Sequence, residues 1–258
     1  MVASLSALTR LEKLDLRFRS PRSRAVRETR HPPPLTRVVF PALTWLWFKG
    51  DSEYVEDIMS RIDAPLLDNM NITFFNQLLF DAPQLRHVIS RMGILRAPDC
   101  ARIFFRDDHV TVELCQKLSL RILCKPSDWQ LSSLSQLYNS ALSFLPTLER
   151  LEIHNGRRYW EDDMENVQWL EFLQLFPSVK ELVLSAKSFQ LVAPALNELD
   201  KTVLPAIQTI VIQGPRSSEP DTKAIGKLIA TRPSQLLDRP VTIQRRDGKD
   251  LDDVRVVY

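Results

Sequence analysis

Apolar positions along the chain recur in a short motif: a proline, then apolar residues two, five and seven positions later. Six copies begin at Pro41, Pro65, Pro83, Pro146, Pro177 and Pro205. A seventh copy without the proline spans Leu11–Leu16, and the copy at Pro83 is incomplete because Ser90 takes its last apolar position. The last two apolar residues of each copy are two positions apart, which puts them on one face of a short strand. Proline suits the loop before a strand because it fixes φ and lacks an N–H group. We therefore expect one strand per copy.

Apolar residues with helical spacing fill the intervals between the motifs. Asp51 and Ser52 can cap a helix whose apolar face carries Tyr54, Val55, Ile58, Met59 and Ile62. Ser127 can cap a second helix, and two further stripes predict helices around 167–176 and 224–229. In the long interval after Pro83, residues 101–106, 110–115 and 118–124 read as strands, the first two as a hairpin around Asp107 and Asp108.

Strands that alternate with helices in a repeated motif are the signature of leucine-rich repeats. We therefore predict an α/β fold, an irregular leucine-rich-repeat solenoid or horseshoe, with a parallel sheet on its concave side and helices on its convex side. Residues 1–258 should form a single domain of this type. Within it, 18–37 should be an arginine- and proline-rich mobile loop between the first two repeats, and 247–258 a C-terminal tail.

Strand alternation predicts that the third, fifth and seventh residues of each motif, counted from its first apolar residue, face a partner on the concave surface, with Val183 and Val211 among them. The expected binding set includes Trp45, Trp47, Lys49, Asn69, Asn71, His87, Arg150, Glu152 and His154. Two neighbouring tryptophans on an exposed face are typical of an interaction hot spot. The alternative is that the arginine-rich loop or a terminal segment folds over them.

Positive charge is concentrated between the first two motifs. The candidate residues for an anionic partner are Arg17, Arg19, Arg22, Arg24, Arg27 and Arg30. They could bind phosphate, nucleic acid or an acidic protein surface, or they could form a solvated loop without a fixed partner. Nucleic acid is the less favoured partner, because Phe18 is the only aromatic residue among the arginines.

Composition excludes several classes of protein. No apolar run approaches the roughly 20 residues that span a bilayer, and the N-terminus lacks a hydrophobic signal core, so we expect a cytoplasmic or nuclear protein without a membrane partner. The net charge of +2 points to no class of partner. The three cysteines, Cys100, Cys115 and Cys124, lie beside or within apolar strands, which favours buried free thiols.

No pattern of residues predicts catalysis, a cofactor or a metal. Only six glycines occur, so no phosphate-cradling or dinucleotide-binding loop is present. Asp107–His109 favours a turn over a metal site, because neighbouring strand residues point to opposite faces. The acidic run 161–165 favours an exposed loop, with binding of a basic peptide as the alternative.

A more specific likeness rests on the stretches Leu11–Phe18, Pro34–Leu43, Gly50–Tyr54, Asp63–Asn69, Pro126–Leu131 and Leu145–Ile153. Together they resemble the leucine-rich-repeat half of the large fungal, mushroom-type F-box protein families. The resemblance covers nearly the whole chain and is not specific for any substrate. It implies the substrate-recognition part of a cullin-type ubiquitin ligase, in which an F-box binds a Skp-type adaptor and the repeats capture the target.

This sequence departs from that family at its start, because a repeat strand begins at Leu11 with no helical F-box before it. We therefore expect an adaptor and a cullin as partners only if an F-box lies elsewhere. The chain would then be a truncated form, a fragment or a relative that kept the recognition half. The alternatives are a binder of anionic ligands or nucleic acid through its arginines, or a free-standing leucine-rich-repeat scaffold without a link to a ligase.

Overall fold

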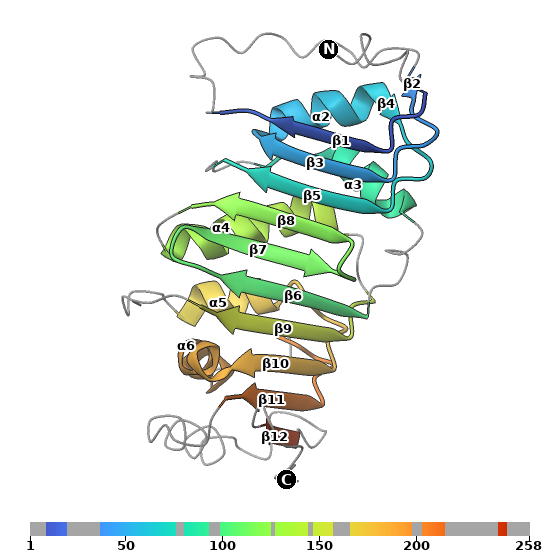
Figure 1. Cartoon of the computed structure of the whole chain (residues 1–258). Coiled ribbons are helices and arrows are strands. Elements are labelled where there is room, and N and C mark those ends of the chain that lie inside the picture. The colour runs from blue at the N-terminus through green and yellow to red at the C-terminus, as the bar shows by residue number, and fades with distance from the viewer. Residues whose placement is uncertain are drawn as a thin grey trace.

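Ten strands lie side by side in one mixed α/β arrangement, with most of the helices packed against one face of the sheet (Figure 1). The computed structural model describes residues 9–19, 37–75, 80–92, 99–124, 127–143, 147–156, 166–197, 203–214 and 242–246. The strand order is β1-β3-β5-β8-β7-β6-β9-β10-β11-β12, and a separate pair, β2 and β4, forms a two-stranded sheet. All neighbours in the large sheet are parallel except those on either side of β7.

The strands of the large sheet are β1 (Lys13–Arg17), β3 (Trp45–Gly50), β5 (Asn69–Phe74), β6 (Cys100–Phe105), β7 (His109–Leu114), β8 (Leu118–Leu123), β9 (Arg150–Asn155), β10 (Glu181–Ser185), β11 (Thr209–Gln213) and β12 (Thr242–Arg246). The small sheet pairs β2 (Val38–Val39) with β4 (Ile62–Asp63). The helices are α2 (Ser52–Arg61), α3 (Pro83–Arg91), α4 (Ser127–Leu137) with its π-helical continuation η2 (Tyr138–Leu142), α5 (Asn166–Leu173) and α6 (Ala186–Asn197).

Four prolines of the motif, Pro41, Pro65, Pro177 and Pro205, occupy one structural position, the second residue of a tight turn that leads into a strand. The residue two places after the proline donates its N–H to the carbonyl one place before it. Four copies make this hydrogen bond: Leu43 to Phe40, Leu67 to Ala64, Val179 to Phe176 and Ile207 to Leu204. Proline is favoured at this position because its fixed φ matches the turn. Six copies of the motif, including the one without proline, supply β1, β3, β5, β9, β10 and β11, as predicted.

A repeated backbone contact joins each of these turns to the preceding unit. Two successive N–H groups donate to a single carbonyl: Thr44 and Trp45 to Glu12, Asp68 and Asn69 to Thr44, Lys180 and Glu181 to Glu149, Gln208 and Thr209 to Lys180. Because the contact uses only backbone atoms, it fixes the register between neighbouring strands without a particular side chain. It satisfies donors that would otherwise be left without partners at the start of each strand.

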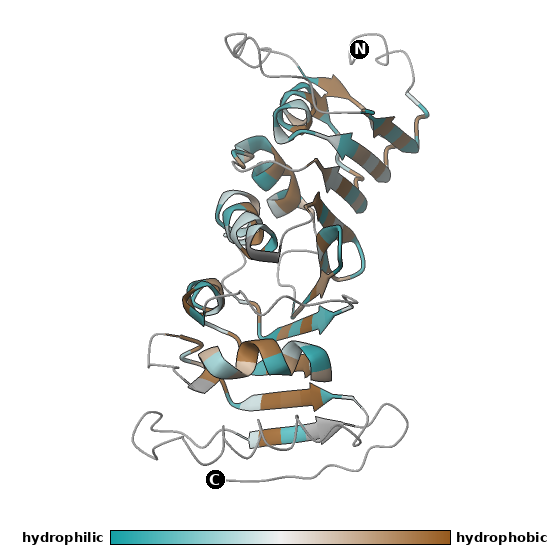
Figure 2. Ribbon diagram, turned by 90° about the vertical axis from the view of Figure 1, so that its left-hand side faces the viewer, coloured by the Kyte–Doolittle hydropathy of each residue, from teal (hydrophilic) through white to brown (hydrophobic). Residues whose placement is uncertain are grey.

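The core lies between the sheet and the helices. One residue from every strand of the large sheet forms a continuous buried row: Leu14, Leu46, Met70, Leu118, Leu114, Ala101, Leu151, Leu182, Ile210 and Ile243. Alternation along the strands produces the bands of hydrophobic and hydrophilic residues in Figure 2. Apolar residues of the helices, among them Val55, Leu131 and Phe172, belong to the same core.

The motif at Pro83 forms helix α3 and not a strand, so this prediction was wrong. Pro83 occupies the first turn of the helix, a position that suits proline as well as a pre-strand loop does. Leu85 and Ile89, one turn apart, are both fully buried. The carboxylate of Glu56 in α2 accepts hydrogen bonds from the N–H groups of Gln84 and Leu85, both at 2.8 Å, and so caps the helix.

The interval 100–124 inserts three strands into the sheet. β6 and β7 form the hairpin that the sequence predicts around Asp107 and Asp108, and β8 follows antiparallel to β7. The chain first places β6 away from β5 and then returns, so that β8 pairs with β5 and β6 pairs with β9. The helix predicted from Ser127 follows as α4 and carries the chain to β9.

Several predictions concern residues outside the described part of the chain. Of the loop predicted at 18–37, only Phe18, Arg19 and Arg37 are described, and Arg37 donates to Gln84. The predicted helix at 224–229, the acidic run 161–165 and the tail 247–258 also lie outside it. Among the described helices, none has the length and apolar character needed to cross a membrane.

Candidate functional site

The face of the sheet opposite helices α2 to α5, which we call the helix-free face, presents most of the residues expected to bind a partner. Strand register aligns its central row across the molecule: Asp15, Trp47, Asn71, Ser119, Glu113, Arg102, Glu152, Val183, Val211 and Gln244. The character of this row changes along the sheet, from aromatic and polar to charged and then to aliphatic. Three zones of the face therefore differ in what they can bind.

The first zone centres on the two tryptophans of β3. Trp45 and Trp47 are both half-buried on the helix-free face, and their rings meet edge to face with centroids 5.5 Å apart. The guanidinium of Arg17 lies over the ring of Trp47, 4.0 Å from its centroid, and forms a two-pronged ion pair with Asp15. This cation–π contact holds the indole of Trp47 in place while part of it stays accessible.

Polar and basic residues surround the tryptophans. Lys49 lies over the ring of Phe75, with Nζ 5.8 Å from its centroid. Asn69 and Asn71 of β5 are half-buried beside Trp45 and Trp47, to which the register pairs them. Trp45, Trp47, Lys49, Asn69 and Asn71 thus lie together on one face, as the strand pattern predicts.

The second zone is a charged cluster around Glu152 of β9. The Glu152 side chain is only 9% exposed, although it lies on the helix-free face. It accepts hydrogen bonds from Arg150 Nε at 2.9 Å and Arg102 Nε at 3.1 Å, and His154 Nε2 lies 3.4 Å from it. Arg150 also bonds Glu181 at 3.2 Å, which extends the cluster to β10.

The environment of Glu152 favours its ionised form. Burial is the largest single influence and opposes ionisation. The hydrogen bond with His154 and the charges of Arg150 and Arg102 together outweigh it, so the pKa of Glu152 lies below its usual value. The predicted residues Arg150, Glu152 and His154 therefore lie together. The Glu152 carboxylate, however, is engaged in ion pairs within the chain and is too buried to contact a partner.

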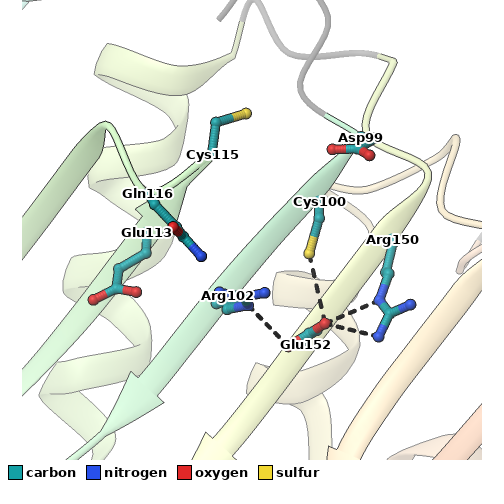
Figure 3. A pocket seen from close by; sticks show the side chains of 8 residues that line it. All are labelled: Asp99, Cys100, Arg102, Glu113, Cys115, Gln116, Arg150 and Glu152. Atoms are coloured by element: carbon teal, nitrogen blue, oxygen red, sulfur yellow. Dashed lines mark hydrogen bonds and ion pairs between the residues drawn. The ribbon is translucent and has the colours of Figure 1, made fainter. Parts of the chain in front are cut away.

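A shallow polar cavity of about 430 Å³ lies beside this cluster, where the ends of β6, β7 and β9 meet (Figure 3). Its lining includes Asp99, Glu113 and Gln116 in addition to the arginines and Glu152. Figure 3 shows Arg102 and Arg150 converging on Glu152 from two sides, with the Cys100 thiol aimed at the same carboxylate. Both arginines are held in ion pairs, Arg102 with Glu152 and Arg150 with Glu152 and Glu181, so neither is free to bind an anion in the cavity.

The thiols at this cavity are poor nucleophiles. Burial and then the negative charge of Glu152 raise the pKa of Cys100 to about 11, so it is protonated at neutral pH. Burial also raises the pKa of Cys115. Cys124 is buried as expected, whereas Cys100 and Cys115 are partly exposed. The arrangement offers polar recognition and no activated group for covalent chemistry.

The turn at the rim of the cavity is strained. Cys115 and Gln116, which join β7 to β8, have φ of 51° and 58°, in the left-handed region that favours glycine or asparagine. Lys117 N donates to Leu114 O at 3.0 Å and closes this two-residue hairpin. Positive φ at both central residues is the requirement of a type I′ turn.

The third zone is aliphatic. Val183 and Val211 should face solvent by strand alternation, yet both are completely buried. They lie within continuous apolar runs, Leu182–Leu184 and Ile210–Ile212, which is typical of strands buried on both faces. The prediction that this row is exposed in every unit is therefore wrong for β10 and β11.

His87 does not belong to the helix-free face. It lies exposed on α3, because the motif at Pro83 is helical, and its backbone carbonyl accepts a hydrogen bond from Ser90 Oγ. Of the six arginines proposed to bind an anionic partner, Arg17 belongs to β1 and Arg19 is exposed beyond it. Arg22, Arg24, Arg27 and Arg30 lie outside the described residues.

Sequence reasoning missed Arg102, Glu113 and Cys100, which contribute to the cavity from the inserted strands. Strand alternation alone could have placed Arg102 and Cys100 on one face, because they are two residues apart. Their position next to Glu152 required the pairing of β6 with β9, which no periodicity reveals.

Asp108 and His109 form a hairpin-turn contact, as the turn prediction implies. Asp108 Oδ1 lies 2.6 Å from His109 Nδ1, and this hydrogen bond lowers the pKa of Asp108. Within the residues that the structure describes, no three histidine, cysteine or acidic side chains are placed to hold a metal ion.

Comparison of the chain with protein-family models, curated proteins and solved structures gives no match.

Proposed function

We propose that this chain is a protein–protein interaction module, an irregular leucine-rich-repeat solenoid that captures a partner on its helix-free face and catalyses no reaction. The observation that carries the proposal is the pair of tryptophans, Trp45 and Trp47, which are only half-buried on a sheet face without a described helix. Tryptophan is enriched among the residues that dominate binding energy, because a large rigid ring loses little entropy when it is covered.

The resemblance to fungal F-box proteins suggests a specific role for this module. We propose that the chain is the substrate-recognition part of a cullin-type ubiquitin ligase, and that a Skp-type adaptor binds only through an F-box located elsewhere. The proline-led turns and the repeated backbone contacts between units support the solenoid part of this proposal. The link to a ligase rests on the resemblance alone.

Affinity purification of the tagged chain from a fungal extract, with quantitative mass spectrometry, tests the proposal. We expect Trp45→Ala with Trp47→Ala to abolish the enrichment of a specific partner while changing the thermal midpoint little, because both rings lie outside the main core. Trp129→Ala is the matched control, since Trp129 on α4 is 40% exposed but lies on the helical side.

The outcomes separate the parts of the proposal. Co-purification of a Skp-type adaptor and a cullin would support coupling to a ligase, and their absence beside one reproducible partner would indicate a free-standing module. The assignment of the tryptophans to binding would be overturned by two results together: a large loss of stability in Trp45→Ala with Trp47→Ala, and an equal loss of captured proteins in the Trp129→Ala control.

A further inference from the structure

The tryptophans are part of a larger basic–aromatic patch, formed by Lys13, Arg17, Trp45, Trp47 and Lys49. Strand register places Lys13 beside Trp45, and Arg17 beside Lys49. Within the described residues, Lys13 and Lys49 form no ion pair, whereas Arg17 is shared between Asp15 and the ring of Trp47. The patch therefore combines accessible apolar surface with two uncompensated cations.

The two lysines bracket the exposed apolar surface along the strands. Lys13 lies level with Trp45, and Lys49 lies four residues further along β3, with Trp47 between them. At about 3.3 Å per residue and about 4.8 Å between strands, the two attachment points are about 14 Å apart. An extended polypeptide covers this distance in about four residues, and its side chains at positions i, i+2 and i+4 point to the same face.

The distribution of charge favours a polypeptide over a nucleic acid. The carboxylate of Asp15 lies in the middle of the patch, at the level of Trp47 and between the levels of the two lysines. Arg17 is already paired with Asp15, so a continuous phosphate backbone would meet no unpaired cation between the two lysines, whereas two separate carboxylates with an apolar residue between them match the lysines. Arg102 and Arg150 at the cavity are held in ion pairs with Glu152, so these two arginines offer no comparable unpaired charge.

We infer that the basic–aromatic patch binds an acidic segment of a partner protein, with a carboxylate, an apolar side chain and a second carboxylate at alternate positions. The apolar side chain contacts Trp45 and Trp47, and the carboxylates pair with Lys13 and Lys49. This inference rests on the proposed function and names the chemistry of the segment that the module recognises.

Selection from a displayed library of short random peptides tests the inference with the whole chain as bait. We expect enriched peptides to carry aspartate or glutamate about four positions apart around an aromatic or aliphatic residue. A synthetic peptide of that pattern should bind about tenfold more weakly to Lys13→Glu with Lys49→Glu, because two attractive ion pairs become repulsive. Binding to the wild-type chain should weaken as salt is added.

A matched charge control is available on other elements of the fold. Arg86 of α3 and Lys187 of α6 are both exposed, and Arg86→Glu with Lys187→Glu changes the net charge by the same amount. This control should bind the peptide as the wild-type chain does. Equal weakening in both double variants would show a non-specific effect of net charge and would overturn the inference.

The remaining outcomes distinguish failure of this inference from failure of the proposed function. Enriched peptides that are neutral or basic, and whose binding requires Trp47, would agree with partner binding on the helix-free face but would overturn the inference that the bound segment is acidic. Tight binding of single-stranded oligonucleotides that is lost in the lysine variant would also overturn it, in favour of nucleic acid. Absence of enrichment, or enrichment unaffected by both the tryptophan and the lysine variants, would count against both proposals.

Discussion

At the scale of single residues, the helix-free face shows how neighbours decide whether a side chain is free to act. Trp47 and Glu152 occupy equivalent places in the same row of the sheet. Arg17 holds the Trp47 ring from one side and leaves it partly accessible, whereas Arg102 and Arg150 enclose Glu152 almost completely. The first residue can contact a partner, and the second stabilises the sheet.

The ion pairs of Glu152 make part of the stability depend on pH. Because the pKa of Glu152 is lower in the folded chain, its contribution is present above the unfolded pKa of about 4.3 and is lost as pH falls through the folded value. Glu152→Gln should lower the free energy of unfolding by about 1–3 kcal/mol at neutral pH, since Arg102 and Arg150 lose a charged acceptor.

Urea titrations at a series of pH values measure this effect. The wild-type chain should lose its advantage over Glu152→Gln below about pH 4.3. Glu149→Gln serves as the control, because Glu149 is an exposed carboxylate paired with Lys180 and should change stability little at any pH. A constant difference between wild type and Glu152→Gln across the range would contradict the assignment.

At the scale of secondary-structure elements, local sequence predicts the strands and leaves their partners open. Pro41 and Pro83 open the same motif, yet one leads into β3 and the other begins α3. Proline suits both positions, and the decision lies in contacts distant along the chain: Glu56 caps α3, and Leu85 and Ile89 reach the core only as a helix. The local propensity of residues 83–91 contains no information about a cap that is supplied by a side chain of another helix.

The same limit explains the candidate site. Trp45, Trp47 and Lys49 could be predicted together because they alternate along one strand, and Asn69 and Asn71 because they occupy the same positions in the next copy. The cavity could not be predicted, because Arg102 meets Glu152 only after β6 has been placed beside β9. Val183 and Val211 were misplaced because alternation alone does not reveal that a strand is buried on both faces.

The turn between β7 and β8 carries a testable cost. Cys115 and Gln116 adopt positive φ without being glycine or asparagine, at an expected penalty of about 1–2 kcal/mol each. Cys115→Asn with Gln116→Gly should therefore raise the free energy of unfolding by about 1–2 kcal/mol, because this pair suits a type I′ turn. Urea unfolding measures the change, with Cys115→Ala as the control for loss of the thiol.

An unchanged or reduced stability in the asparagine–glycine variant would show that contacts of the native side chains offset the strain. The variant is also informative for the cavity, since Gln116 lines its rim.

At the scale of the whole molecule, the inserted strands join two sets of parallel strands into one sheet. β1, β3 and β5 lie on one side of the insertion, and β9 to β12 on the other. Strand β7 is hydrogen-bonded on both edges, so its backbone donors are all committed to neighbours. The continuity of the sheet across the molecule depends on this strand.

Thr111→Pro tests that dependence. Proline removes a backbone donor from a strand that is paired on both sides, which central strands tolerate poorly. We expect urea unfolding followed by hydrogen exchange to separate into two transitions, one for β1–β5 and one for β9–β11. A single transition at the wild-type midpoint would show that helix packing alone couples the two sets.

The pairing of the insertion sets a parity rule for this architecture. β8 must run parallel to β5, and β6 must run parallel to β9, so both edges of the insertion point the same way. Successive strands of a meander run in opposite directions. The first and last strands of a meander therefore run in the same direction only when the number of strands is odd. This fold can therefore gain or lose such strands only in pairs, because a change by one strand would leave one edge of the insertion antiparallel to its neighbour in the sheet.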